Sequence, residues 1–138
     1  MAYISQEKKK ELAVGIKKVL KKYGMKGTVG VNHHSSLVVN LWEGALDLLG
    51  DAQKHNDKVA QQRGQESYSI GDYLQVNTYR ADEWAFSETI ANFYKELIAA
   101  MKGTEWYNKS DIMTDYFDIA YYLDVNVGKW DKGYVYNA

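Results

Sequence analysis

Carboxylates gather near the C-terminal end of the chain, where they offer the ligands of a metal site or the pair of a two-carboxylate mechanism. They are Asp111, Asp115, Asp118 and Asp124. Asp118 and Asp124 are six residues apart, and on one strand, at about 3.3 Å per residue, this separation is about 20 Å. Such a distance is too long for a shared metal ion or a shared substrate bond. Asp111 and Asp115 can meet across a turn, where a role as turn or cap residues is the alternative.

The chain has three histidines, His33, His34 and His55. Adjacent strand residues point to opposite faces, so His33 and His34 would bind one metal ion only from a distorted turn. Two serines follow His34, but the signature of a nucleophile elbow is missing, as are the phosphate-loop and dinucleotide-binding patterns. We therefore expect no metal site and no cofactor. A small hydrolase or nucleotide-processing enzyme remains an alternative, which requires His33, His34, Asp111 and Asp115 in one concavity.

A strict two-residue period runs through residues 116–127 and predicts a strand with two different faces. The apolar face consists of Phe117, Ile119, Tyr121, Leu123, Val125 and Val127. The other face consists of Tyr116, Asp118, Ala120, Tyr122, Asp124 and Asn126. Tyrosines supply large amphipathic contact area, and neighbouring carboxylates can bind a partner's arginine or lysine. The second face therefore predicts a protein-binding surface, with an ordinary solvated sheet face as the alternative.

Residues 73–79 alternate in the same way and predict another strand. If both strands share one face, their polar and aromatic side chains form a single surface, here called the Tyr/Asp patch. The patch consists of Tyr73, Gln75, Asn77, Tyr79, Tyr116, Asp118, Tyr122, Asp124 and Asn126. A base-stacking surface for RNA fits this patch poorly, because Asp118 and Asp124 would repel phosphates.

The N-terminal part of the chain is basic. Residues 1–34 contain eight lysines and two glutamates, a net charge of +6, while the remainder has nine basic and sixteen acidic residues, a net charge of −7. An amphipathic helix is predicted from the cap residue Ser5 to a stop at Gly24. Its exposed side carries Lys10, Lys17, Lys18 and Lys21. These lysines support a second hypothesis, a nucleic-acid-binding module, and the charge asymmetry favours pairing between copies, such as a homodimer.

The remaining pattern predicts the fold class. Two strand-like runs, residues 28–31 and 37–42, flank a polar turn and predict an antiparallel hairpin. Residues 51–67 are polar and predict an exposed, mobile loop. A second long helix is predicted to begin at the cap residue Asp82 and to end at Gly103. The resulting order is α-β-β-β-α-β, which we interpret as an α+β fold with a four-stranded antiparallel sheet and two helices on one face.

Length and composition predict a single domain of residues 1–138. The chain has no cysteine, so it forms no disulfide and no thiolate zinc site. It lacks an export-signal pattern at its start and any apolar run of about 20 residues. We therefore expect a cytoplasmic protein that makes no membrane contact.

Two stretches of the chain resemble a known group of proteins. The first is Lys21-Lys-Tyr-Gly-Met-Lys-Gly-Thr-Val-Gly-Val-Asn-His-His-Ser-Ser-Leu-Val-Val, together with the preceding helix from Ser5. The second is Ser110-Asp-Ile-Met-Thr-Asp-Tyr-Phe-Asp-Ile-Ala-Tyr-Tyr, followed by Val127-Gly-Lys-Trp-Asp-Lys. They resemble small uncharacterised proteins of tailed bacteriophages and, more distantly, an accessory domain of large polyvalent proteins of mobile elements. The resemblance implies a phage-encoded protein in the host bacterial cytoplasm, and it assigns no activity and no residue role.

These observations lead to one preferred hypothesis. The chain is interpreted as a non-catalytic phage accessory protein that binds a host macromolecule, in the first place a host protein, through the Tyr/Asp patch. Countering a host defence or redirecting host machinery is the role that the implied context suggests.

Overall fold

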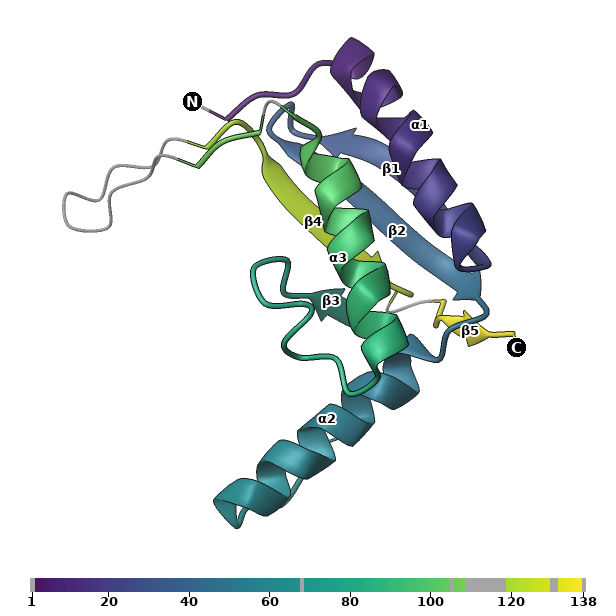
Figure 1. The fold of residues 1–138 in the computed structure, drawn as a ribbon, viewed down its shortest axis with the longest axis vertical. Helices are drawn as coiled ribbons and strands as arrows, with labels where there is room; N and C mark the ends of the chain where they lie inside the picture. Colours follow the sequence, from purple (N-terminus) through teal and green to yellow (C-terminus); the bar gives the residue numbers. More distant parts are fainter. Residues whose placement is uncertain (1, 68, 105, 109–118, 130–131, 138) are drawn as a thin grey trace, which may run out of the picture.

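The structure is a computed structural model that describes residues 2–67, 69–104, 106–108, 119–129 and 132–137. The helices in this part of the chain are α1 (Gln6–Lys22), α2 (Leu48–Arg63) and α3 (Glu88–Lys102). The strands are β1 (Met25–Asn32), β2 (Ser36–Gly44), β3 (Leu74–Val76), β4 (Tyr122–Val127) and β5 (Val135–Tyr136). Figure 1 shows their arrangement.

The sheet is mixed, which corrects the predicted antiparallel four-stranded sheet. Its strands follow the order β1-β2-β4-β3, and β5 pairs with the end of β2. The β1/β2 and β3/β4 pairs are antiparallel, but β2 and β4 are parallel. A long connection containing α2, β3 and α3 separates β2 from β4 in the sequence, and parallel neighbours require such a crossover. The α+β class is confirmed, whereas the side-chain alternation carried no information about strand direction.

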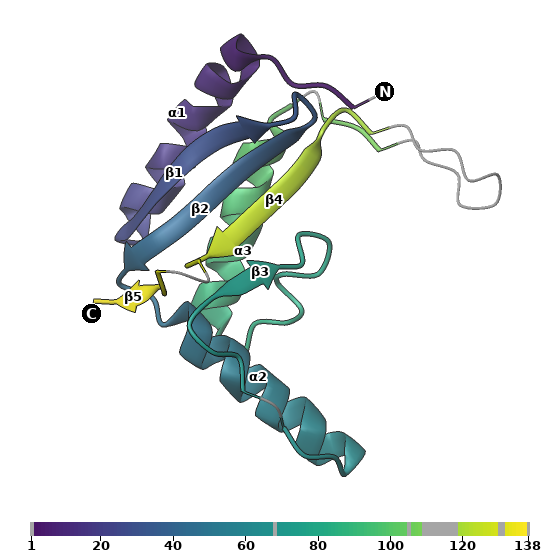
Figure 2. The same ribbon diagram turned by 180° about the vertical axis from the view of Figure 1, so that it is seen from behind.

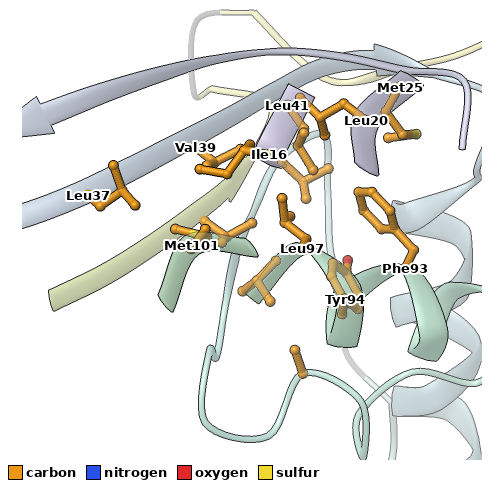
Figure 3. Close-up of a cluster of buried hydrophobic side chains, with 14 of the residues drawn as sticks. Ile16, Leu20, Met25, Leu37, Val39, Leu41, Phe93, Tyr94, Leu97 and Met101 are labelled. Carbon is orange, nitrogen blue, oxygen red and sulfur yellow. The ribbon is translucent and has the colours of Figure 1, made fainter. Parts of the chain in front are cut away.

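The core lies between the sheet and two helices, α1 and α3, which cover the same face (Figure 1). Alternate residues of β2, such as Leu37 and Val39, point to these helices and are fully buried. Phe93 and Leu97 of α3 belong to the same buried cluster (Figure 3). The side chains of one sheet face are thereby removed from water, which is the dominant favourable contribution to folding.

The predicted helix at residues 5–24 is confirmed as α1. The Ser5 hydroxyl accepts a hydrogen bond from the Lys8 amide at 3.0 Å and caps the first turn. Gly24 follows the helix with a φ angle of 68°, in the left-handed region that glycine adopts without strain. Local sequence signals therefore determine both ends of this helix.

Helix α2 replaces most of the predicted mobile loop at residues 51–67. Asp47 caps its start, accepting a hydrogen bond from the Gly50 amide at 3.0 Å, and Gly64 ends it at a φ angle of 66°. The helix projects from one end of the sheet (Figure 1), so it buries few side chains and needs no apolar stripe. The polar composition of these residues therefore led to the prediction of a loop in place of a helix.

Helix α3 begins at Glu88, later than the predicted cap residue Asp82. The Ser87 hydroxyl makes no capping hydrogen bond. Instead, the Asp51 carboxylate of α2 accepts hydrogen bonds from the Phe86 amide at 2.9 Å and the Ser87 amide at 2.6 Å. The cap comes from another helix, so no local pattern could reveal it.

Two predicted strands are shorter in the structure, and one strand was not predicted. β3 covers only Leu74–Val76 of the predicted range 73–79. β4 begins at Tyr122; before it, Ile119 forms only an isolated bridge with Asn108, and residues 116–118 lie outside the described residues. β5 pairs with only the last residues of β2, and its short length explains why alternation did not reveal it.

Candidate interaction surface on the open sheet face

The face of the sheet opposite α1 and α3, here called the open face, has no described helix over it (Figure 2). Because side chains alternate along a strand, the residues between the buried ones point to this face. The strand registers place them in neighbouring rows. The open face consists of Thr28 of β1, Val38, Asn40 and Trp42 of β2, Tyr122, Asp124 and Asn126 of β4, and Gln75 of β3.

Polar side chains form a row across three strands of the open face. The Gln75 side-chain amide donates a hydrogen bond to the Asp124 carboxylate at 3.3 Å. The Asn126 side-chain amide donates a hydrogen bond to the side-chain oxygen of Asn40 at 3.1 Å. These hydrogen bonds hold the side chains in defined positions before a partner arrives, which reduces the entropy lost on binding.

Trp42 lies beside this row, two residues after Asn40 on β2, and is 42% exposed. The Lys26 ammonium is 5.6 Å from the centre of the Trp42 indole ring and 3.0 Å from the Glu43 carboxylate. Beside Trp42 is a hollow of about 280 Å³, whose wall includes Lys129 and Lys132. This end of the open face therefore combines an aromatic side chain with several cations.

Tyr122 lies toward the other end of the open face and is 44% exposed. It shares a small hollow with Tyr79 and Lys102. The Lys102 ammonium in turn is 4.6 Å from the centre of the Trp106 ring. Exposed or partly exposed aromatic side chains thus lie on both sides of the polar row along the strand direction, a composition enriched in protein interfaces.

The structure brings part of the Tyr/Asp patch together. The strand pairing places Gln75, Tyr122, Asp124 and Asn126 on the open face. Tyr79 adjoins Tyr122, since both line the same hollow. Four residues of the patch therefore share the open face, and Tyr79 lies beside one of them.

The strand pairing extends to none of the other members of the Tyr/Asp patch among the described residues. Tyr73 is exposed just before β3. Asn77 is a turn residue, because its side-chain oxygen accepts a hydrogen bond from the Tyr79 amide at 3.0 Å. This turn replaces the predicted continuation of β3 through residues 77–79. Tyr116 and Asp118 lie outside the described residues.

The contribution of β2 to the open face was not predicted from the sequence. The alternation of residues 37–42 puts Val38, Asn40 and Trp42 on the side away from the core, and this was a readable signal. Its importance depends on β2 lying beside β4, with Asn40 opposite Asn126. The two strands lie far apart in the sequence, and the alternation within each strand does not show that they are neighbours in the sheet.

The lysines proposed for nucleic-acid binding lie elsewhere. Lys10, Lys17, Lys18 and Lys21 are exposed side chains of α1, which packs on the opposite side of the sheet from the open face (Figure 2). The basic helix surface and the open face are therefore separate candidate surfaces.

The candidate catalytic histidines do not form a cluster with the third histidine. His33 and His34 form the β1/β2 turn with φ angles of 54° and 58°, whereas His55 belongs to α2. The candidate carboxylates Asp111 and Asp115 lie outside the described residues. Within the part of the chain that the structure describes, no group of three or more His, Cys, Asp or Glu side chains is arranged to hold a metal ion.

A pocket of about 90 Å³ lies between α2, β3 and α3, with Asp51, Asn56 and Tyr94 in its wall. The Asp51 carboxylate already accepts two backbone hydrogen bonds. Burial raises the pKa of the Tyr94 hydroxyl above its usual range. The Asn56 side-chain nitrogen is buried and has no partner among the described residues. The recess is therefore small and polar, and His55 also lies in its wall.

None of the helices in the described part of the chain combines the length and the apolar composition that a bilayer-spanning segment requires. No family model, no curated protein and no solved structure matches this chain. Inferences about function therefore depend on the geometry and chemistry of the described residues.

Proposed function

We propose that this chain is a non-catalytic binding protein whose open face docks a partner protein. The observation that supports this proposal is the polar row from Gln75 to Asn40, with exposed Trp42 and Tyr122 on opposite sides of it. Following the resemblance to phage proteins, the partner would be a bacterial host protein. Interference with a host defence or redirection of host machinery would be the consequence of that binding.

The size of the open face is consistent with the centre of an interface. The order β1-β2-β4-β3 places four strands side by side. These strands have 8, 9, 6 and 3 residues. At about 4.8 Å between strands and about 3.3 Å per residue, such a face presents roughly 400 Å². A stable complex buries about 800 Å² on each partner. The surrounding side chains, including Lys26, Lys129 and Tyr79, would therefore have to supply the rim.

The chemistry of the open face also indicates the partner's surface. Trp42 and Tyr122 provide amphipathic area with few rotatable bonds, which is typical of residues that contribute most to binding free energy. Asp124 accepts one hydrogen bond from Gln75, and its carboxylate has further acceptor capacity for an arginine or lysine. The lysines beside Trp42, at the opposite end of the open face from Tyr122, favour acidic groups on the partner. We infer that the partner's surface carries basic groups where it meets Asp124 and acidic groups where it meets these lysines.

The proposed docking is tested by affinity capture from bacterial host lysate with the native chain and with a Tyr122→Ala/Asp124→Ala variant. Loss of one aromatic contact and one charged contact is expected to weaken the captured complex at least about tenfold, equivalent to about 1.4 kcal/mol. The dissociation constant is then measured with the purified partner by calorimetry.

A Tyr3→Ala/Asp57→Ala variant is the matched control, because both side chains are exposed and neither belongs to the open face. It should bind the partner as the native chain does. Capture of no specific protein, or equal binding by both variants, would refute docking through the open face.

A further inference from the structure

The outer edge of β1 is a long strand edge without a neighbouring strand. β1 has eight residues, and the sheet order leaves it paired only with β2. In the described part of the chain, no backbone group of another segment bonds to its outer side. Natural proteins usually protect such edges with proline, charged residues or bulges. Here the chain has no proline, and a register shift between Lys26 and Gly27 interrupts the pairing only near the start of β1.

A groove of about 390 Å³ runs beside this edge, between α1 and β1. Lys10, Val14 and Lys17 line it from the helix, and Gly27 and Val29 line it from the strand. Residues at positions i, i+4 and i+7 share one face of a helix. The two lysines therefore lie on either side of the valine, along the groove.

The charge of the groove is positive and uncompensated. Lys9 also lines it, and none of its three lysines forms an ion pair with a described residue. The two glutamates of α1 do not line the groove, and one of them, Glu11, pairs with Lys8 at 3.8 Å. The groove thus favours an anionic occupant.

The groove also has an apolar centre. Val14 is 59% exposed, although it lies on a helix that packs against the sheet. Val29 and Val31 are only half-buried, whereas Val39 and Leu41 on the neighbouring strand are buried almost completely. A further strand beside β1 would cover these valines in the way that β1 flanks β2.

We propose that the outer edge of β1 binds an extended acidic peptide as an additional strand. Backbone hydrogen bonds to β1 would supply affinity, as in other cases of strand addition, and side-chain pattern would supply specificity. This binding relies on the strand edge and on the lysines of α1, so it does not depend on the proposed function of the open face.

The spacing of the groove residues predicts the peptide pattern. Lys10 and Lys17 are seven residues apart on α1, or about 10 Å at about 1.5 Å per residue. On an extended strand, same-face residues at positions i and i+4 are about 13 Å apart, and flexible lysine side chains span the difference. The expected motif is therefore acidic, any, apolar, any, acidic, with the apolar side chain over Val14 and Val29.

Nucleic acid is the competing polyanion. It would use the exposed lysines of α1 through phosphate contacts, including Lys18 and Lys21, which do not line the groove. Phosphate contacts of this kind do not involve the backbone groups of the strand edge or the exposed side chain of Val14. These two features favour the peptide.

The test measures fluorescence anisotropy of a labelled peptide that carries glutamate, valine and glutamate at alternate positions with threonine between them. At about 0.15 M salt, where exposed charges farther apart than about 8 Å are largely screened, this peptide should bind the native chain. A Lys10→Glu/Lys17→Glu variant should bind it at least about tenfold more weakly, since both flanking charge contacts become repulsive. A Lys18→Glu/Lys58→Glu variant makes the same change in net charge outside the groove and should bind nearly as the native chain does.

Three further probes separate strand addition from simple charge attraction. Methylation of one set of alternate backbone nitrogens should abolish binding, because those N–H groups point to β1, whereas methylation of the other set, which points away from β1, should be tolerated. A peptide with lysines in place of the glutamates should not bind. The bound acidic peptide should slow amide exchange in β1. The proposal is overturned if the acidic peptide does not bind, if the two methylated peptides bind equally, or if both charge-reversal variants lose binding equally. Binding of a ten-nucleotide single-stranded DNA in place of the peptide would assign the lysines to nucleic acid instead.

Discussion

Replacing Phe93 with alanine is expected to lower the free energy of unfolding by about 3–5 kcal/mol. The side chain is fully buried in the core between the helices and the sheet (Figure 3). Its ring packs edge-on against Tyr23 at 5.2 Å and lies 5.6 Å from the ring of Tyr94. The substitution removes these contacts and leaves a cavity that the surrounding helices and sheet can fill only in part.

The change is measured by urea unfolding, followed by circular dichroism. Phe86→Ala is a matched control, because Phe86 is 53% exposed and its ring has the Lys54 ammonium at 5.9 Å. It should cost no more than about 1 kcal/mol. Similar losses for the two variants would contradict the position of the core between the sheet and the two covering helices.

Replacing Asp51 with alanine is expected to cost about 3 kcal/mol, because it leaves two backbone amides at the start of α3 without an acceptor. Asp51 is only 6% exposed, and its carboxylate is the acceptor for both the Phe86 and Ser87 amides. Asp51→Asn keeps one oxygen acceptor and nearly the same size, so its loss should be smaller. The order of stability is therefore expected to be native, then asparagine, then alanine.

Urea unfolding gives the size of the Asp51 effect, and hydrogen exchange gives its location. Exchange in Asp51→Ala should accelerate at the start of α3 and along α2, since the two helices lose their link. Asp57→Ala, in an exposed part of the same helix, should change the stability by about 0.5 kcal/mol or less. If Asp51→Ala lost no more stability than Asp57→Ala, the carboxylate would not be the cap of α3.

Local signals predicted the parts of the fold that depend on neighbouring residues. Ser5 and Gly24 marked the ends of α1, and the polar turn at residues 32–36 joined two strands as expected. The apolar stripe of α3, including Phe93 and Leu97, became part of the core. These features follow from capping and from periods of 3.6 and 2, which the sequence contains directly.

The features that were not predicted depend on distant contacts. The cap of α3 comes from Asp51, which lies 35 and 36 positions before the two amides that it binds. The parallel β2/β4 pair depends on a crossover through α2 and α3. The polar α2 has no apolar stripe because it buries few side chains. Propensity and periodicity describe one segment at a time and therefore miss contacts of this kind.

The same limit applies to the candidate surface. Alternation placed Tyr122, Asp124 and Asn126 on the side away from the helices, where the structure also has them. It did not show that Asn40 and Trp42 adjoin them, because that requires the pairing of β2 with β4. The role of this surface in binding stays a prediction.

Hydroxyl-radical footprinting of the captured complex tests the open face most directly, because it reports the solvent exposure of individual tyrosine and tryptophan side chains. Trp42 and Tyr122 are accessible in the free chain, as are Trp84 and Tyr3 outside the open face. Since the centre of an interface excludes water, Trp42 and Tyr122 should oxidise several-fold more slowly in the complex, while Trp84 and Tyr3 oxidise at their original rates. Unchanged oxidation of Trp42 and Tyr122, with protection elsewhere, would contradict docking through the open face.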